Sequence, residues 1–205
     1  WRIEKRDKIT GALIWNKTSN PTANWDVARA IIVDGSGIYV SGYENSPGNV
    51  GWRIEKLNLT TGALIWTQTS NPSGSSEAAY AITADASGIY VTGSDYSPGN
   101  NQWRIEKRDL TTGALIAAFG TGGVVTNNLS TSTDIPWAIT ANVGGIYVGG
   151  QDNSPGNGQW RIEKRDPFTG TLLCTQTGNP SAGFDGANAI TADAGGIYAA
   201  GRDIS

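Results

Sequence analysis

Four carboxylates recur at one place in a repeated unit, and their spacing could support chemistry. Each lies four residues before the first alanine of an apolar segment. They are Asp26, Glu77, Asp134 and Asp185. If the copies meet around an axis, four like charges repel one another unless a cation or hydrogen-bond donors offset them. We therefore expect either a Ca²⁺ or Na⁺ ion in a central channel, or carboxylates that each cap their own loop by accepting backbone N–H groups.

The residues around these carboxylates differ between repeats, although the repeats are nearly identical elsewhere. Arg29, Tyr80, Trp137 and Asn188 follow by three positions, and Trp25, Ser76, Thr133 and Phe184 come directly before. Aromatic rings beside carboxylates and amides could stack on sugar rings or clamp a peptide. The sequence predicts a ligand-binding rim, with relaxed packing of loops as the alternative. The residues assigned to it are Trp25, Arg29, Tyr80, Trp137, Phe184 and Asn188.

The composition excludes several kinds of enzyme. Histidine is absent from the 205 residues and Cys174 is the single cysteine, so Ser-His-Asp and Cys-His nucleophiles, histidine metal sites and an internal disulfide are excluded. The four carboxylates occupy equivalent positions in the repeats, so the sequence distinguishes no general acid among them. We therefore predict no enzyme and no cofactor. A glycoside hydrolase that uses two carboxylates about 5 to 10 Å apart is the third alternative.

Charge and hydropathy limit the partners. The net charge of −3 argues against nucleic acid and anionic membranes, because both attract a basic face. An apolar run of 18 residues is also missing, so we expect no membrane span. The sequence starts at Trp1 and contains no methionine, which indicates a processed, excised or partly observed product.

The segment WRIEK marks four repeats, which begin at Trp1, Trp52, Trp103 and Trp160. The spacings are 51, 51 and 57 residues, and the longer third unit carries its insertion between Ala117 and Asp134. Apolar residues alternate with period two between turn residues, which predicts four short strands in each repeat. Tandem units of four antiparallel strands and this length are typical of β-propeller blades.

The repeats also resemble known bacterial families. The run RIEKLNLTTGALIWTQTSNPSGSSEAAYAITADASGIYVTG resembles the SBBP repeat, with its TG turn, LxW strand, acidic residue before an AIxxD strand and GxIYVxG strand. Residues 119–125 resemble the delta-60 repeat, and TGALIW at 10–15 and 61–66 is similar to the blades of pyrroloquinoline-quinone dehydrogenases. These resemblances imply a β-propeller and no single activity.

The phase of the repeats suggests how the fold closes. The sequence begins at the third strand of one blade and ends after the second strand of another, so 197–201 could pair with 1–7. We predict one domain, 1–205, that is all-β and forms a propeller of four blades closed by this pairing. The alternative is a piece of a larger propeller or of a longer array.

Three further sets of residues carry structural expectations. The alternating arginines and glutamates of the WRIEK strands should form exposed ion pairs on blade faces. The tyrosine of each GIYV or GIYA strand should pack between blades with its hydroxyl on a polar partner. Cys174 takes the place of Trp15 and Trp66 and should be a buried, inert thiol.

Together these features predict an extracellular or cell-surface scaffold that binds glycan or protein without catalysis. The alternative is a structural unit of a longer array or filament, in which the chain self-associates.

Overall fold

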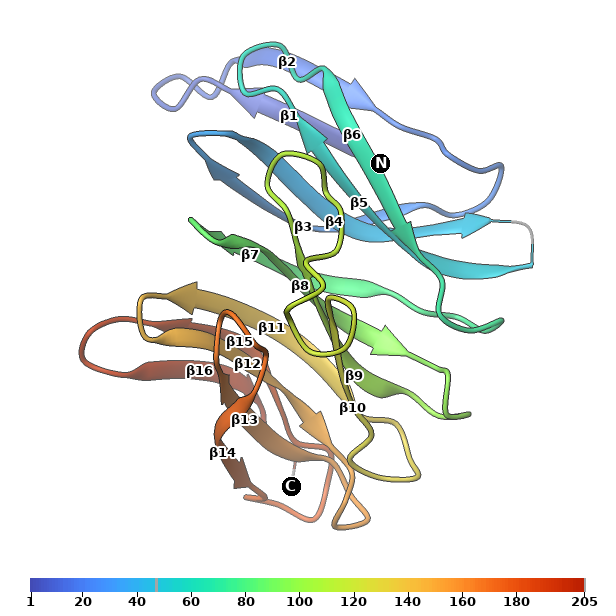
Figure 1. The fold of residues 1–205 in the computed structure, drawn as a ribbon, viewed down its shortest axis with the longest axis vertical. Helices are drawn as coiled ribbons and strands as arrows, with labels where there is room; N and C mark the ends of the chain where they lie inside the picture. Colours follow the sequence, from blue (N-terminus) through green and yellow to red (C-terminus); the bar gives the residue numbers. More distant parts are fainter. Residues whose placement is uncertain (47, 205) are drawn as a thin grey trace.

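The computed structural model describes residues 1–46 and 48–204, whereas Pro47 and Ser205 lie outside the described residues. The chain is all-β and forms three four-stranded antiparallel sheets between two two-stranded pairs, stacked along the long axis of the molecule (Figure 1). The N-terminal pair is β1 (Arg2–Arg6) and β2 (Leu13–Thr18). The first sheet is β3 (Val27–Asp34), β4 (Gly37–Ser46), β5 (Asn49–Leu57) and β6 (Leu64–Ser70).

The other sheets repeat this order of strands. The second sheet is β7 (Ala79–Asp85), β8 (Gly88–Asp95), β9 (Gln102–Arg108) and β10 (Val124–Asn127). The third sheet is β11 (Ile135–Asn142), β12 (Gly145–Asp152), β13 (Gln159–Arg165) and β14 (Leu172–Gly178). The C-terminal pair is β15 (Gly186–Ala192) and β16 (Ile197–Arg202). The predicted four-stranded antiparallel unit is confirmed for the three complete sheets.

The TG hairpins between third and fourth strands form through a side-chain cap and a glycine. Asp109 Oδ1 accepts the backbone N–H groups of Thr111 and Thr112, at 3.0 and 2.8 Å. Gly113 follows with a φ of +72°, a left-handed conformation that glycine adopts without steric cost. The same glycine conformation recurs at Gly11, Gly62 and Gly170.

The insertion in the third repeat changes the fourth strand of the second sheet. The segment that matches β6 makes only an isolated bridge, Arg108 with Leu115, and β10 comes after the insertion. Phe119 from the inserted loop is fully buried, and its ring lies 6.1 Å from that of Tyr90. Tyr39 and Trp66 lie at the same distance in the first sheet. Phe119, rather than Ala117, therefore takes the packing role of the tryptophan.

The sheets are joined by buried aromatic and aliphatic side chains. Trp52 and Ile54 of the first sheet pack against Ala79, Ile82 and Val91 of the second. Each tryptophan of a WRIEK segment also donates its indole N–H to a backbone carbonyl of the following sheet or pair, over 2.6 to 3.2 Å. These donors and acceptors are Trp1 with Tyr43, Trp52 with Ser94, Trp103 with Gln151 and Trp160 with Arg202.

The expected closure of the ring is absent. β16 pairs only with β15 and β1 only with β2, so 197–201 and 1–7 do not pair. The pair β1 and β2 lies in the upper part of the molecule and the pair β15 and β16 in the lower part (Figure 1). The prediction of four blades closed by the terminal strands is wrong for this structure, because β1 and β16 each lie at a sheet edge and do not pair with each other.

Two of the smaller expectations also need correction. Glu106 and Glu163 are fully buried, each between two arginines of its own strand, so these ion pairs are not the exposed ones predicted. Cys174, on the fourth strand of the third sheet, β14, is exposed and not buried as predicted. The expected hydroxyl partners are confirmed for Tyr39 and Tyr90, which donate to the carbonyls of Leu110 and Pro167 in the following sheets.

Within the described residues, no helix has the length and apolar character to cross a membrane.

Candidate functional site

Four of the six predicted rim residues lie at β-bulges. In each first strand the pairing with the second strand shifts by one residue, and the unpaired residue is Arg29 in β3, Tyr80 in β7, Trp137 in β11 and Asn188 in β15. A bulge leaves one residue without a cross-strand partner and redirects its side chain. We call these four residues the bulge row. The strands that carry them contact one another in order along the stack.

A glycine opposite each bulge makes the shift possible. A Cβ atom on Gly93 would overlap the carbonyl oxygen of Ala78 and lie 2.7 Å from the indole of Trp52. Gly42, Gly150 and Gly201 have the same relation to their first strands. All four glycines therefore leave room for the bulge, and Gly42, Gly93 and Gly150 also leave room for the tryptophan of the preceding sheet or pair.

The bulge row lines two adjoining hollows. The first, about 380 Å³, is lined by Trp25, Arg29, Tyr43, Tyr80 and Asn101 among others. The second, about 370 Å³, is lined by Arg29, Tyr80, Trp137, Asn188 and Arg202. Arg29 and Tyr80 belong to both. The structure thus brings together four of the six predicted ligand-binding residues in one hollow and places Trp25 in the next.

Aromatic rings and guanidinium groups lie close to one another along these hollows. The rings of Tyr80 and Trp137 lie 4.9 Å apart and tilted by 49°. The Arg29 guanidinium lies 5.9 Å from the Tyr80 ring and 5.4 Å from the Tyr43 ring. Phe184, the sixth predicted residue, is about half exposed and lies 5.6 Å from the Arg202 guanidinium. Such contacts hold a guanidinium group over an aromatic ring and leave the N–H groups at the edge of the guanidinium plane.

Several polar groups of the hollows remain available to a ligand. Among the described residues, the side chains of Arg29, Asn188 and Arg202 make no hydrogen bond within the protein, and all three residues are exposed. Trp25 is 80% exposed beside the first hollow. An arginine offers five N–H donors that match a carboxylate well.

The four carboxylates do not gather into a cation site. Within 1–46 and 48–204, no group of three acidic, cysteine or histidine side chains could hold a metal ion. Asp134 instead accepts the backbone N–H groups of Ser130 and Asn153, at 2.8 and 2.7 Å. Asp26 and Asp185 bind their own loops in the same way, through Thr22 and Asn45 and through Ser181 and Ile204. The axial ion expected at Asp26, Glu77, Asp134 and Asp185 is therefore replaced by loop capping.

Burial changes the acidity of two of these carboxyl groups. Desolvation raises the pKa of Glu77 above its ordinary value, and the hydrogen bonds from Ser73 offset only part of the effect. Burial likewise raises the pKa of Asp134. Both groups hold the loop before the bulge and so position the bulge row, and Glu77 also borders the first hollow.

Among the residues that line the hollows, sequence reasoning missed Tyr43, Asn101 and Arg202. Arg202 lies at the end of β16, where the other repeats carry Tyr43, Ser94 and Gln151. The residue type at this position differs between repeats, as it does at the bulge row, and this difference could have identified Arg202 from the sequence. Asn49, Asn100 and Asn157 of the SPGN segments were also missed, and each anchors the loop before the bulge through its side-chain amide.

Comparison with known proteins adds no family. No family model matches the chain, and no curated protein matches its sequence.

Proposed function

We propose that this chain is a binding scaffold without catalytic activity, and that the bulge row binds a glycan that carries carboxylate groups. The observation that carries the proposal is the placement of Arg29, Tyr80, Trp137 and Asn188 in one hollow. They come from four first strands that occupy equivalent places in the repeats, yet they differ in chemistry. A rigid frame with variable residues at one site is typical of binding proteins.

The chemistry of the hollows suits acidic sugars. Tyr80 and Trp137 offer two aromatic faces on which sugar rings stack through their C–H groups. Arg29 and Arg202 lie on either side of this pair and can bind carboxylates with paired N–H donors. Asn188 adds an amide for hydroxyl groups. Uronic acid polymers combine these features, and they occur outside cells, which accords with the proposed extracellular or cell-surface location.

The proposed architecture is an arc of a larger β-propeller or of an array built from the same units. Its support is the order in which β3, β7, β11 and β15 follow one another at the inner edge of the stack, as the first strands of propeller blades do. The open edges of β1 and β16 favour an array or a larger ring over a ring of four.

A carboxylate-based hydrolase is less well supported. Glu77, Asp134 and Asp185 are almost completely buried, and hydrogen bonds from their own loops occupy their oxygens. A general acid or nucleophile must reach its substrate, so these groups would need the loops to open.

A panel of oligosaccharides tests the proposal. Isothermal titration with oligogalacturonate, hyaluronan oligosaccharides and neutral cello-oligosaccharide should show binding of the acidic sugars and at least about tenfold weaker binding of the neutral one, a difference of about 1.4 kcal/mol. Equal binding of all three, or none, would contradict the acidic-glycan assignment. Capture of peptides from a display library together with no glycan binding would favour a protein ligand at the same hollows.

A further inference from the structure

The two hollows of the bulge row differ in charge. Arg29 lines both of them. In the hollow of about 380 Å³, which lies between the first and second sheets, the carboxyl group of Glu77 borders the same space. In the hollow of about 370 Å³, none of the described residues that line it is acidic. The guanidinium group is therefore balanced by an acidic residue in the first hollow and is not balanced in the second.

The first hollow also offers neutral hydrogen-bonding groups. Asn45 lies on β4 and Asn101 lies directly before β9, so the first and second sheets each contribute one amide. Within the described part of the chain, both residues form hydrogen bonds only through their backbone atoms. A side-chain amide has donors and an acceptor, which suits the hydroxyl and acetamido groups of a neutral sugar.

Aromatic rings flank these amides. Trp25 is an exposed ring at the border of the first hollow, and Tyr43 and Tyr80 form part of its wall. The Arg29 guanidinium lies 5.4 Å from the Tyr43 ring and 5.9 Å from the Tyr80 ring, so it is close to both. Aromatic rings stack on the C–H faces of a sugar whether or not the sugar is charged. The first hollow can therefore hold a sugar ring without a carboxylate.

The position of Glu77 disfavours an acidic sugar in the first hollow. Glu77 Oε1 accepts the backbone N–H of Ser73 at 2.8 Å, which fixes the carboxyl group at this wall. The nearby Asp95 is paired with Arg104 at 3.2 Å, whereas Glu77 forms no salt bridge among the described residues. The ionised Glu77 repels a carboxylate, and this repulsion is weakly screened because the group is buried.

The two hollows share a wall, so their occupants would be neighbours in one ligand. Arg29 of the first sheet and Tyr80 of the second line both hollows. The Tyr80 ring lies 4.9 Å from that of Trp137 in the third sheet. The strands β3, β7 and β11, which carry these residues, contact one another in this order. A ligand that fills both hollows therefore crosses from one sheet to the next.

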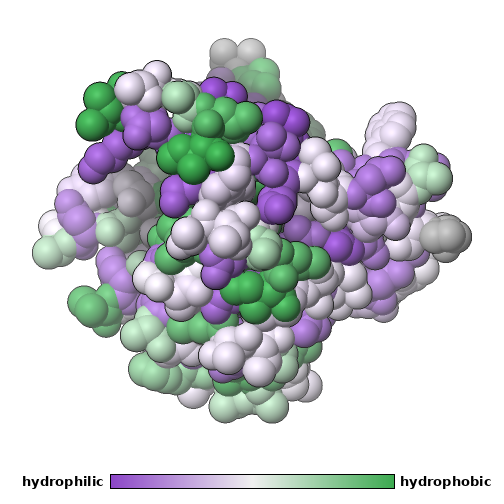
Figure 2. Space-filling model, turned by 90° about the horizontal axis from the view of Figure 1, so that it is seen from above, coloured by the Kyte–Doolittle hydropathy of each residue, from purple (hydrophilic) through white to green (hydrophobic). Residues whose placement is uncertain are grey.

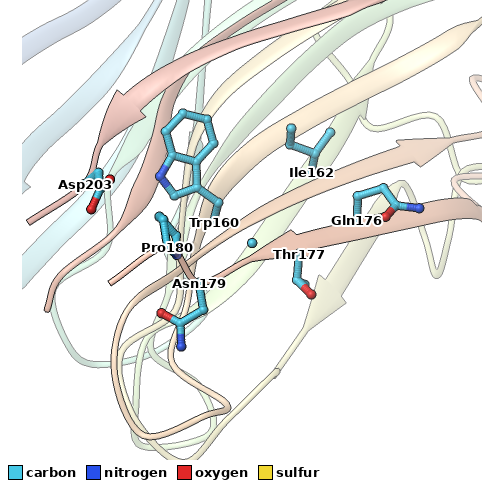
Figure 3. Close-up of a pocket in the computed structure, with 8 residues that line it drawn as sticks. Trp160, Ile162, Gln176, Thr177, Asn179, Pro180 and Asp203 are labelled. Atoms are coloured by element: carbon cyan, nitrogen blue, oxygen red, sulfur yellow. The ribbon is translucent and has the colours of Figure 1, made fainter. Parts of the chain in front are cut away.

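Other parts of the surface carry different chemistry. A hollow of about 570 Å³ lies beside Trp160, and the charged residue that borders it, Asp203, is acidic (Figure 3). A further hollow contains Arg104, but salt bridges with Asp95 and Glu106 occupy that guanidinium. The end of the molecule seen in Figure 2 carries hydrophobic residues as separate patches among hydrophilic ones. None of these places combines an available guanidinium with neighbouring aromatic rings.

We propose that the ligand of the bulge row is a polymer in which uronic acid units and neutral sugar units alternate. The first hollow holds a neutral sugar with hydroxyl or acetamido groups, and the adjoining hollow holds the uronate against Arg29. A polymer that is acidic at every unit would place a carboxylate beside Glu77. This inference rests on the function proposed above, and it names the substrate class for the same site.

Isothermal titration at pH 8 with three hexasaccharides tests the alternation. A hyaluronan hexasaccharide alternates acidic and neutral units, hexagalacturonate is acidic throughout, and chitohexaose is neutral throughout. The wild type should bind the hyaluronan at least about tenfold more tightly than either of the others. Glu77→Gln keeps an acceptor for the Ser73 N–H and removes the charge, so its preference over hexagalacturonate should narrow to about threefold or less.

Asn101→Ala tests the first hollow without changing its charge. It removes one amide of this hollow, so it should weaken hyaluronan binding about fivefold and change hexagalacturonate binding by about twofold or less. Val143→Ala, at the exposed turn between β11 and β12, is the control and should bind all three sugars as the wild type does.

The possible failures can be told apart. Hexagalacturonate that binds as tightly as hyaluronan would overturn the alternation and leave the acidic-glycan function intact. Absence of binding by both acidic hexasaccharides, or chitohexaose that binds as tightly as hyaluronan, would overturn that function as well. Equal effects of Asn101→Ala on the two acidic sugars, or an unchanged preference in a folded Glu77→Gln, would overturn the assignment of the first hollow to a neutral sugar.

Discussion

The rings of Tyr80 and Trp137 lie 4.9 Å apart although they belong to different sheets. Each is the unpaired residue of a β-bulge, and each bulge faces a glycine of the second strand. The aromatic pair therefore depends on backbone geometry that is repeated in every sheet, while the side chain at the bulge is free to vary. Stability and binding can be tested separately, because different residues of the same strands support them.

Gly93→Ala tests the role of the glycine opposite the bulge. The new methyl group would overlap the carbonyl of Ala78 and press on the indole of Trp52, so we expect a loss of at least about 2 kcal/mol in the free energy of unfolding. Urea denaturation followed by tryptophan fluorescence measures the loss. The control is Gly178→Ala, because nothing lies within 4 Å of that position. Equal effects of the two substitutions would show that the bulge does not require glycine.

Glu106→Gln tests the buried ion pairs. Glu106 is fully buried between Arg104 and Arg108, and its neutralisation leaves Arg108 without its anion and Arg104 with Asp95 alone, which costs about 3 to 5 kcal/mol. Glu4 makes the same pairs with Arg2 and Arg6 at the exposed end of the stack, so Glu4→Gln is a matched control with a much smaller expected loss. A similar loss for both variants in urea denaturation would contradict the buried role.

Glu77→Gln tests the effect of burial on acidity. Because burial raises the pKa of Glu77 above 4.5, the folded chain prefers the neutral carboxylic acid. The cost of the charged form is absent below about pH 4 and grows as the pH rises through the raised pKa. We therefore expect the stability of Glu77→Gln, relative to the wild type, to increase from about pH 4 to about pH 8. A difference in the free energy of unfolding that does not change with pH would contradict this assignment.

Calcium should leave the melting temperature unchanged. Asp134 and its equivalents accept hydrogen bonds from their own loops and do not form a cluster that could hold an ion. A ligand that binds the folded state would raise the melting temperature in proportion to its affinity. Calorimetry with calcium and with a chelator measures the effect. A rise of several degrees in the melting temperature with calcium would support a bound axial ion and contradict this prediction.

Much of the local structure could be predicted from the sequence, because alternation and turn residues are local signals. The strands around Ile89 and Trp103 and the turn at Gly113 follow directly from them. The burial of Glu106 could not be read from its own strand, since the next sheet determines what covers it. Likewise, Ala117 occupies the tryptophan position in the alignment of repeats, yet the inserted loop delivers Phe119 there.

The candidate site was only partly readable from the sequence. Variation among the repeats identified the bulge row, but not the reason why these side chains meet. The glycine opposite each bulge is visible in GIYVxG, although its meaning depends on the cross-strand register. The exposed Cys174 and the open edge of β16 depend on which sheet follows in space, and a linear pattern carries no information about that.

The most direct test of the proposed function is the affinity of oligogalacturonate for the wild type and for Trp137→Ala, measured by isothermal titration. Trp137 supplies one of the two stacked faces, so its loss should weaken binding about tenfold, or about 1.4 kcal/mol. Phe168→Ala removes an exposed aromatic ring far from the bulge row and should bind as the wild type does. Equal affinity of the wild type and Trp137→Ala would contradict glycan binding at the bulge row.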